Sequence, residues 1–377
     1  MKYYIIAGEA SGDLHGSNLM AEIKKLDPRA DFRVWGGDLM ERQGGILVKH
    51  YRELAFMGFL EVFLNIRTIM RNIKTCKADL LQFKPDVLIL VDYPGFNLRI
   101  AEFASEQNIK VFYYISPQVW AWKKSRVKKI RKFVDRMFVI LPFEKEFYRQ
   151  NDVDVDFVGH PLLDAIENEN RREIDTSAFR KKNQLDQRPI IALLPGSRKQ
   201  EISRMLPVML SISDFYPDYQ FVIAGAPSLA EEYYRNILGK NQVKIIFGQT
   251  HNLLRHSFAA LVTSGTATLE TALLNVPEVV CYKGSNLSYQ IARRIVDVKF
   301  ISLVNLIMDK KIVEELIQND LTIHRLKLET DKILRSDNRN QIFKGYDELR
   351  VKLGGTGASA NTARLMSDYL KSLNSIF

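Results

Sequence analysis

Short apolar runs that alternate with helical patterns constrain the fold of this chain more than any other feature. The run Val87–Val91 is apolar throughout, and residues 189–194 are apolar after their leading proline. Uninterrupted runs of this length are typical of strands that are buried on both faces of a parallel sheet. Because segments with helical spacing separate the runs, we predict an α/β fold built from parallel, doubly wound sheets.

The chain of 377 residues is long enough for two domains, and the pattern divides it into two α/β halves. Each half opens with a strand followed by a glycine-containing turn. We predict a first domain over residues 1–165, a second over 186–345 and a helical tail over 346–377 that packs back on the first. The polar stretch 167–188 is expected to connect the two domains. Strands are expected at residues 2–7, 32–35, 87–91, 110–114, 137–140, 189–194, 221–224, 244–246, 259–262 and 277–282, and helices at 14–26, 98–107, 125–133 and 361–373.

The composition is that of a soluble globular protein, with 46% apolar and 26% charged residues. We expect no signal peptide and no membrane span, because no apolar run approaches the roughly 18 residues that a span needs. The two cysteines, Cys76 and Cys281, form no pair motif, which suits a reducing cytoplasm. The six histidines show no ligand spacing, so we predict neither a metal site nor a cofactor. The formal charge of +10 favours anionic partners.

Residues 261–270 read as a strand end, a turn of small residues at Ser264, Gly265 and Thr266, and a helix start. A helix N-terminus presents unpaired N–H groups and partial positive charge, which suits a phosphate. Glu270 lies roughly 9 Å further along the helix axis, where a carboxylate could bind ribose hydroxyls. The alternative is an ordinary turn that Ser264 caps.

A second phosphate site is predicted at Gly196, Ser197 and Arg198, which follow a strand and open a helix. The alternative is that Arg198 only pairs with Glu201. Asp92 ends a buried strand, where in this fold class a carboxylate reaches the ligand site and can take a proton from a hydroxyl. A turn or N-cap role for Asp92 is weighed equally.

Two further stretches raise the question of a surface that contacts lipid or anionic groups. Residues 56–73 carry bulky apolar side chains, which indicate either a core helix or a contact with acyl chains or a membrane. Residues 123–136 carry eight basic side chains, which indicate a solvated helix face with room for a phosphate or anionic lipid. Asp152, Asp154 and Asp156 alternate with valine, and we favour a half-exposed strand over a metal-binding motif.

Taken together, the stretches resemble the lipid A disaccharide synthases, glycosyltransferases of the GT-B type, in order along most of the chain. The matching stretches are GEASGD (8–13), LAFMGFLEV (54–62), KPDVLILVDYPGFN (84–97), SPQVWAWKKSRVKKI (116–130), LPFEKEFY (141–148), VGHP (158–161), LLPGSR (193–198), SGTATLE (264–270) and SLVNL (302–306). The resemblance implies two Rossmann-like domains that face a cleft. Gly95 stands where family members often have a second aspartate, so no role is carried over there.

The resemblance implies transfer of a diacylated glucosamine from UDP to the 6-hydroxyl of diacylglucosamine 1-phosphate, which gives a β-1,6-linked disaccharide and UDP. It further implies a cytoplasmic enzyme held peripherally at the anionic surface of the inner membrane, and dimerisation through the C-terminal region stays open. By family pattern Asp92 is the catalytic base. The residues expected to bind the donor are Gly196, Ser197, Arg198, Ser264, Gly265, Thr266, Glu270 and Asn305. Those expected to bind the acceptor are Glu9, Ser11, Met57 and Asn97. Contact with acyl chains or a membrane is expected at Phe59, Leu60, Phe63, Ile66 and Met70.

Two rival classes remain. Another GT-B transferase or a UDP-sugar epimerase with a soluble substrate would share SGTATLE but would not need the apolar surface at 56–70. A nucleic-acid-binding module would use the basic run 123–136 and bind with a steep salt dependence. We expect no nucleic-acid partner.

Overall fold

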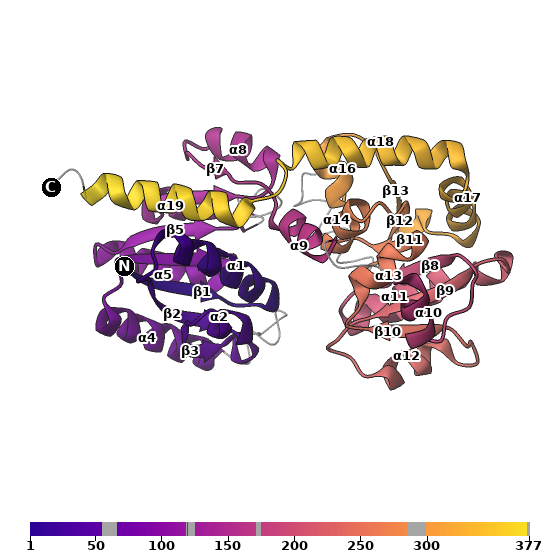
Figure 1. The fold of residues 1–377 in the computed structure, drawn as a ribbon, viewed down its shortest axis with the longest axis horizontal. Coiled ribbons are helices and arrows are strands. Elements are labelled where there is room, and N and C mark those ends of the chain that lie inside the picture. Colours follow the sequence, from indigo (N-terminus) through magenta and orange to yellow (C-terminus); the bar gives the residue numbers. More distant parts are fainter. Residues whose placement is uncertain (55–65, 118, 120–124, 171–174, 285–298, 375–377) are drawn as a thin grey trace. The chain divides into compact units, whose positions relative to one another are not determined.

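The computed structural model describes residues 1–377 except 55–65, 118, 120–124, 171–174, 285–298 and 375–377. The chain forms two compact units (Figure 1). The first comprises Met1–Asp164 together with Leu353–Phe377, and the second comprises Ala165–Lys352. Each unit is described here by itself.

The first unit is built on a seven-stranded sheet with the order β3-β2-β1-β4-β5-β6-β7, and neighbouring strands pair in parallel. Its strands are β1 (Lys2–Ala7), β2 (Asp31–Gly36), β3 (Ile46–His50), β4 (Val87–Val91), β5 (Lys110–Tyr114), β6 (Arg136–Val139) and β7 (Asp156–Phe157). Its helices include α1 (Ala10–Leu26), α2 (Asp38–Arg42), α4 (Ile66–Phe83), α5 (Pro94–Glu106), α7 (Ser125–Phe133), α8 (Pro142–Arg149) and α19 (Ala358–Asn374), with the short η1 (Tyr51–Glu53). Helix α9 (Pro161–Asn170) carries the chain out of this unit.

Both faces of this sheet are buried, which is why its central strands are apolar without interruption. Successive residues of β5 point to opposite faces. Tyr113 lies in the core cluster that α4, α5 and α7 cover, and Tyr114 lies in the cluster that includes residues of α1 and α19. Met366 and Leu370 of α19 belong to the second cluster, so the last helix completes the core of the first unit (Figure 1).

The second unit has a six-stranded sheet with the order β10-β9-β8-β11-β12-β13, again paired in parallel. Its strands are β8 (Ile190–Leu194), β9 (Gln220–Gly225), β10 (Lys244–Phe247), β11 (Ser257–Thr263), β12 (Glu278–Tyr282) and β13 (Glu314–Ile317). Its helices include α10 (Thr176–Lys182), α11 (Lys199–Leu210), α12 (Glu231–Leu238), α13 (Thr250–Arg255), α14 (Thr266–Leu273), α16 (Leu303–Met308), α17 (Ile323–Leu334) and α18 (Ser336–Lys352), with the short η2 (Ser213–Phe215) and η3 (Gln318–Asp320). The predicted α/β class with parallel, doubly wound sheets is confirmed in both units.

Two helices of the first unit begin one turn earlier than their composition indicates. Helix α1 starts at Ala10 rather than at Leu14, and α5 starts at Pro94 rather than at Leu98. In α1 the carboxylate of Asp13 accepts hydrogen bonds from the backbone N–H groups of Gly37, Leu39 and Met40, which fixes the first turn in a helical position. In α5 a proline in the first turn costs no hydrogen bond, since the first N–H groups of a helix have no partner within it.

Outside residues 171–174, the polar stretch 167–188 contains helical structure as well as connecting chain. It contains the end of α9 and all of α10. Asp175 caps α10 by accepting a hydrogen bond from the N–H of Ala178 at 2.9 Å, and Phe179 packs into the core of the second unit. At the other end, α18 buries Tyr346 and Leu349, and the chain returns to the first unit at Leu353 instead of at residue 346.

The alternating aspartates 152–156 do not form the half-exposed strand that we favoured. Only Asp156 and Phe157 pair in β7, and Asp152 lies in a turn. Asp152 forms an ion pair with Arg131 at 3.1 Å, and Asp156 forms one with Arg136. The carboxylates therefore serve separate arginines. Among the residues that the structure describes, no group of three potential ligands could hold a metal ion.

Candidate functional site

A strained elbow follows the buried strand β4. Asp92 and Tyr93 both have positive φ, at 43° and 48°, a conformation that is uncommon for residues other than glycine. The N–H of Asp92 donates to the carbonyl of Tyr114 at 3.2 Å, which extends the pairing with β5 by one residue. The chain then turns directly into α5. Strain of this kind persists only where the surroundings hold it, and it clusters at functional sites.

The carboxyl group of Asp92 titrates well above the usual range for an aspartate. Burial raises its pKa to about 6, and the negative charge of Glu9 contributes in the same direction. A pKa near the working pH makes a carboxylate a better general base, because it still accepts a proton with a favourable driving force. Perturbed carboxyl groups at the carboxyl end of a parallel strand are also typical of active sites.

Tyr93 ties this elbow to the turn between β1 and α1. A Cβ atom added to Gly8 would lie only 2.3 Å from the ring of Tyr93, so the ring needs a glycine beneath it. The Tyr93 hydroxyl donates to the carbonyl of Leu54 at 3.0 Å. Glu9 occupies the N-cap position of α1 without a side-chain capping bond, and Ser11 is exposed in the first turn. Glu9 and Ser11 therefore lie beyond the carboxyl end of β1, at the same end of the sheet at which Asp92 follows β4.

Asn97 is fully buried, whereas a side chain that contacts the acceptor has to be accessible. Its side chain is 0% exposed, and its Nδ2 donates to the carbonyl oxygens of Val91 at 3.2 Å and Asp92 at 2.7 Å. Tyr113, which the sequence did not single out, donates its hydroxyl to the same Asp92 carbonyl at 2.5 Å. These two side chains support the elbow from within the core.

In the second unit the turn after β11 opens into α14. Gly265 is the N-cap, with φ at 149°, and among the described residues the helix has no side-chain cap hydrogen bond. The alternative in which Ser264 caps the helix is wrong, because the Ser264 hydroxyl donates instead to the carbonyl of Ile301 at 2.8 Å. The N-terminus of α14, which starts at Thr266, thus keeps the open geometry that a phosphate needs.

The turn after β8 differs from the turn before α14, because a side chain already accepts hydrogen bonds from its backbone N–H groups. The N–H groups of Ser197 and Arg198 donate to one carboxylate oxygen of Glu201, at 3.1 and 3.3 Å. The Arg198 guanidinium lies 3.7 Å from the other oxygen. Gly196 has positive φ and packs against the Glu201 side chain. The pairing of Arg198 with Glu201, which was the alternative to a phosphate site, is therefore present as a long ion pair with an exposed guanidinium, a geometry that contributes little stability.

Glu270 lies on α14 within reach of a histidine to which the sequence assigns no role. The His251 Nε2 on α13 is 3.4 Å from the Glu270 carboxylate, and both side chains are partly exposed. No motif spacing indicated this pair, because the two residues are separated by strand β11 and meet only in the folded sheet.

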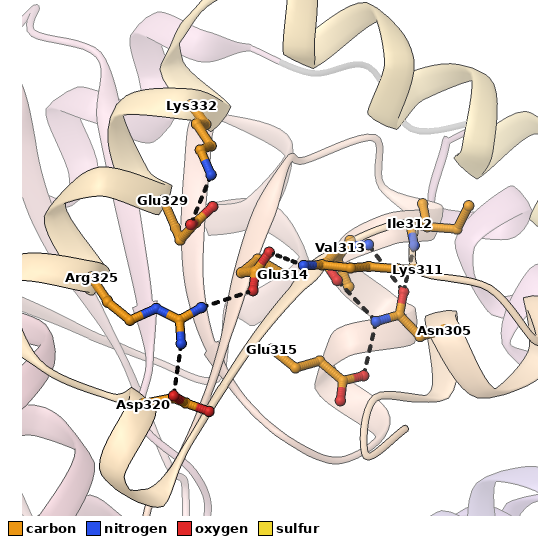
Figure 2. A network of polar contacts seen from close by, with 10 residues as sticks. All are labelled: Asn305, Lys311, Ile312, Val313, Glu314, Glu315, Asp320, Arg325, Glu329 and Lys332. Atoms are coloured by element: carbon orange, nitrogen blue, oxygen red, sulfur yellow. Dashed lines mark hydrogen bonds and ion pairs between the residues drawn. The ribbon is translucent and has the colours of Figure 1, made fainter. Parts of the chain in front are cut away.

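Asn305 lies in a network of polar contacts in the second unit (Figure 2). Its side chain is 0% exposed and makes four hydrogen bonds: Nδ2 donates to Val313 O and Glu315 Oε1, each at 2.9 Å, and Oδ1 accepts from the N–H groups of Ile312 and Val313, at 2.7 and 3.0 Å. Glu315 in turn accepts from the backbone N–H groups of Ile301 and Ser302, each at 3.0 Å. The carbonyl of Ile301 receives the Ser264 hydroxyl, so Asn305 acts on the turn through two intermediates.

Four of the residues predicted to face acceptor or lipid lie outside the described part of the chain, namely Met57, Phe59, Leu60 and Phe63. Of the residues predicted to face acyl chains or a membrane, the two that are described are exposed apolar side chains in α4, Ile66 at 55% and Met70 at 56%. No helix in the described ranges is long and apolar enough to cross a membrane.

Comparison with known proteins identifies the family. A family model described as lipid-A-disaccharide synthetase matches residues 3–367. The lipid-A-disaccharide synthase of Syntrophus aciditrophicus is 42% identical over 97% of each chain. The enzyme of that name from Coxiella burnetii is 37% identical over 97% of this chain and 98% of its own.

Solved structures support the fold. A UDP-GlcNAc 2-epimerase from Neisseria meningitidis superposes with a TM-score of 0.64 at 14% identity, covering 99% of this chain and all of that one. A putative UDP-N-acetylglucosamine 2-epimerase from Listeria monocytogenes gives 0.67 at 13% identity, covering 99% and 97%. At this identity the likeness concerns the two Rossmann-like units alone. On the full-length family match, this chain belongs to the lipid-A-disaccharide synthetase family.

Proposed function

We propose that this chain is an inverting hexosyltransferase that makes the lipid A disaccharide. It joins UDP-2,3-diacylglucosamine to 2,3-diacylglucosamine 1-phosphate and releases UDP. Family membership over nearly the whole chain supports the reaction. The observation that carries the mechanism is the buried carboxyl group of Asp92 at the end of β4, whose pKa is raised to about 6.

In the proposed reaction the acceptor 6-hydroxyl oxygen attacks the anomeric carbon of the donor sugar. Asp92 takes the hydroxyl proton as the new carbon–oxygen bond forms. The bond from the anomeric carbon to the phosphate oxygen breaks, and UDP leaves with the electron pair. A single in-line displacement of this kind inverts the configuration, which gives the β-linked product.

The donor residues have separate tasks in this proposal. The open N-terminus of α14 at Gly265 receives the pyrophosphate, because its N–H groups and partial charge favour an anion. Arg198 exchanges its weak contact with Glu201 for the developing phosphate charge. Glu270 accepts hydrogen bonds from the ribose hydroxyls. The acceptor lies near Glu9 and Ser11, at the same end of the parallel strands as Asp92.

We further propose that the first unit meets an anionic membrane surface through one layer of helices. Helices α4, α5 and α7 cover the same core cluster. The exposed pair Ile66 and Met70 on α4 lies beside exposed Arg67 and Arg71. Helix α7 buries Val127 and Ile130 and turns its basic side chains outward. Apolar side chains next to cations suit an interface with anionic lipid.

The direct test is UDP release from UDP-diacylglucosamine, with and without diacylglucosamine 1-phosphate. Release that requires the lipid acceptor, together with a disaccharide product, is expected. Turnover of a soluble UDP-sugar without a lipid acceptor would contradict the proposal and favour a UDP-sugar epimerase or another transferase.

The role of Asp92 is tested by Asp92→Asn. Removing the base while keeping the shape is expected to lower turnover about 10²–10⁴-fold, the usual contribution of a positioned proton acceptor. The affinity for UDP, measured by calorimetry, should be unchanged. Near-normal turnover of this variant would remove Asp92 from the mechanism.

A further inference from the structure

The backbone carbonyl of Asp92 receives two hydrogen bonds from buried side chains. The Tyr113 hydroxyl donates to it at 2.5 Å from the neighbouring strand β5, and the Asn97 Nδ2 donates at 2.7 Å from the first turn of α5. Both side chains are 0% exposed. A carbonyl oxygen has two lone pairs, so these donors use its full capacity.

These bonds act on a peptide group in a strained conformation. Asp92 has φ at 43°, and Tyr93, the next residue, has φ at 48°. Such a pair of residues relaxes toward the extended or right-handed region unless its surroundings oppose the change. Rotation of the peptide group between Asp92 and Tyr93 would turn the carbonyl oxygen away from both donors. Because the Asp92 side chain starts from the same residue, relaxation would also redirect its carboxyl group.

The two side chains that donate these hydrogen bonds keep their protons and their orientation at working pH. Burial raises the pKa of Tyr113 well above its usual value, so its hydroxyl keeps the proton that it donates. The Asn97 amide donates a further hydrogen bond to the carbonyl of Val91 at 3.2 Å, which fixes its orientation. Tyr113 belongs to the core cluster on one face of the sheet, and Asn97 is buried on α5. Neighbouring packing therefore limits the movement of both side chains.

We propose that Tyr113 and Asn97 are positioning residues that hold the Asp92 carbonyl and thereby aim the base at the acceptor hydroxyl. The inference rests on the proposed role of Asp92 as that base. It gives Asn97 a task beneath the elbow, in place of the acceptor contact that we predicted from the sequence. Neither side chain touches substrate, because both are buried.

The test is Tyr113→Phe, which removes one hydroxyl and keeps the ring in the core. Loss of a single hydrogen bond of ordinary net strength is expected to lower kcat about 3–10-fold. The KM values for donor and acceptor should stay within about twofold, since the variant leaves the binding groups in place. The acid limb of the pH profile should also move to lower pH, because a released Asp92 carboxyl group reaches water and loses part of the burial that raises its pKa.

Tyr114→Phe is the matched control. Tyr114 is the next residue of β5 and is equally buried, but its ring lies in the cluster on the other face of the sheet. Its backbone carbonyl, which receives the Asp92 N–H, is unchanged by the substitution. This control should keep kcat and the acid limb. If Tyr113→Phe behaves like Tyr114→Phe in both readouts, the inference is overturned and the hydroxyl has only a packing role.

A double-variant cycle separates this inference from the proposed function. If Tyr113 acts through Asp92, Tyr113→Phe should have no further effect on the residual turnover of Asp92→Asn. An equal loss in both backgrounds would show that Tyr113 acts elsewhere and would overturn the inference alone. Normal turnover of Asp92→Asn itself would overturn the base assignment and the inference together. Asn97→Leu, which removes the second donor at similar volume, should reproduce the fall in kcat and the shifted acid limb.

Discussion

At the scale of single residues, burial and the charge of Glu9 together set the pH range in which Asp92 is ionised. The pKa of Asp92 is raised first by burial and second by the charge of Glu9. Protonated Asp92 cannot accept a proton, so activity is expected to fall as the pH decreases through about 6. Glu9→Gln removes the second cause and should move this acid limb of kcat/KM to lower pH. The limb should stay above the ordinary range of an aspartate, because burial remains.

The control for Glu9→Gln is Glu22→Gln, which neutralises a carboxylate further along the same helix α1. Glu22 pairs with Lys25 at 2.6 Å and is not among the groups that shift the pKa of Asp92. The control should leave the acid limb in place. An acid limb that is identical in wild type and Glu9→Gln would show that Asp92 does not titrate under the influence of Glu9.

Another residue-scale prediction concerns stability. Glu278 on β12 is 0% exposed, and neither carboxyl oxygen has a hydrogen-bond partner within the part of the chain that the structure describes. Burial, followed by the charge of Glu315, raises its pKa well above the usual value. The folded state therefore keeps a proton that the unfolded chain releases above about pH 4.3. The contribution of this proton to stability is complete below that pH and declines as the pH rises.

Glu278→Gln removes this titration without changing the shape of the side chain. The urea midpoint of the variant should exceed that of wild type by a larger margin at pH 8 than at pH 5. Equal differences at the two pH values would show that Glu278 ionises in the folded state as readily as in the unfolded chain, so that its pKa is not raised by folding.

At the scale of elements, the turn before α14 offers a separable test of the donor site. Gly265 has φ at 149°, and an added Cβ would meet nothing within 4 Å, so Gly265→Ala costs only backbone strain of about 1–3 kcal/mol. Because relaxation of that strain would redirect the N–H groups at the start of α14, we expect weaker binding of UDP by calorimetry. Gly239→Ala is the matched control, since Gly239 also has positive φ and open space but ends α12. Equal UDP affinity of both variants would exclude the turn from the donor site.

The elements themselves were largely readable from the sequence. Central strands such as Val87–Val91 and Lys110–Tyr114 were predicted with their observed bounds, because burial on both faces leaves a continuous apolar run. Strands β3 and β13 were missed: they lie at sheet edges, and their sequences, ILVKH and EELI, mix apolar with charged residues. Edge strands need less burial, so their composition carries a weaker signal.

The candidate site was only partly readable. Asp92, Gly265 and Arg198 were predicted as site residues because each lies in the turn between a strand and the following helix. Tyr113 looked like an ordinary core residue, since only its hydroxyl reaches the elbow. The pairing of Arg198 with Glu201 could be considered because the two residues are three apart, but the contact of His251 with Glu270 joins two helices that meet only in the folded unit. Local sequence shows which residues end a strand, but it does not show which buried side chain reaches them from the next strand.

At the scale of the whole molecule, a net charge of +10 draws the chain toward anionic surfaces, and the first unit carries exposed apolar residues that could hold it there. The double variant Ile66→Ser with Met70→Ser removes both apolar side chains and keeps every charge. It should co-sediment less with vesicles that contain anionic lipid, while UDP affinity stays unchanged. Both residues are more than half exposed, so the urea midpoint should change little.

Val351→Ser is the control for this surface. Val351 is 81% exposed on α18 of the second unit, so its substitution removes an exposed apolar side chain from an element outside the first unit. The control should sediment like wild type. High salt should weaken binding of all three proteins, because screening reduces the attraction of the basic residues. Equal sedimentation of the double variant and wild type at high and low salt would show that membrane contact does not involve α4, and that charge alone brings the protein to the surface.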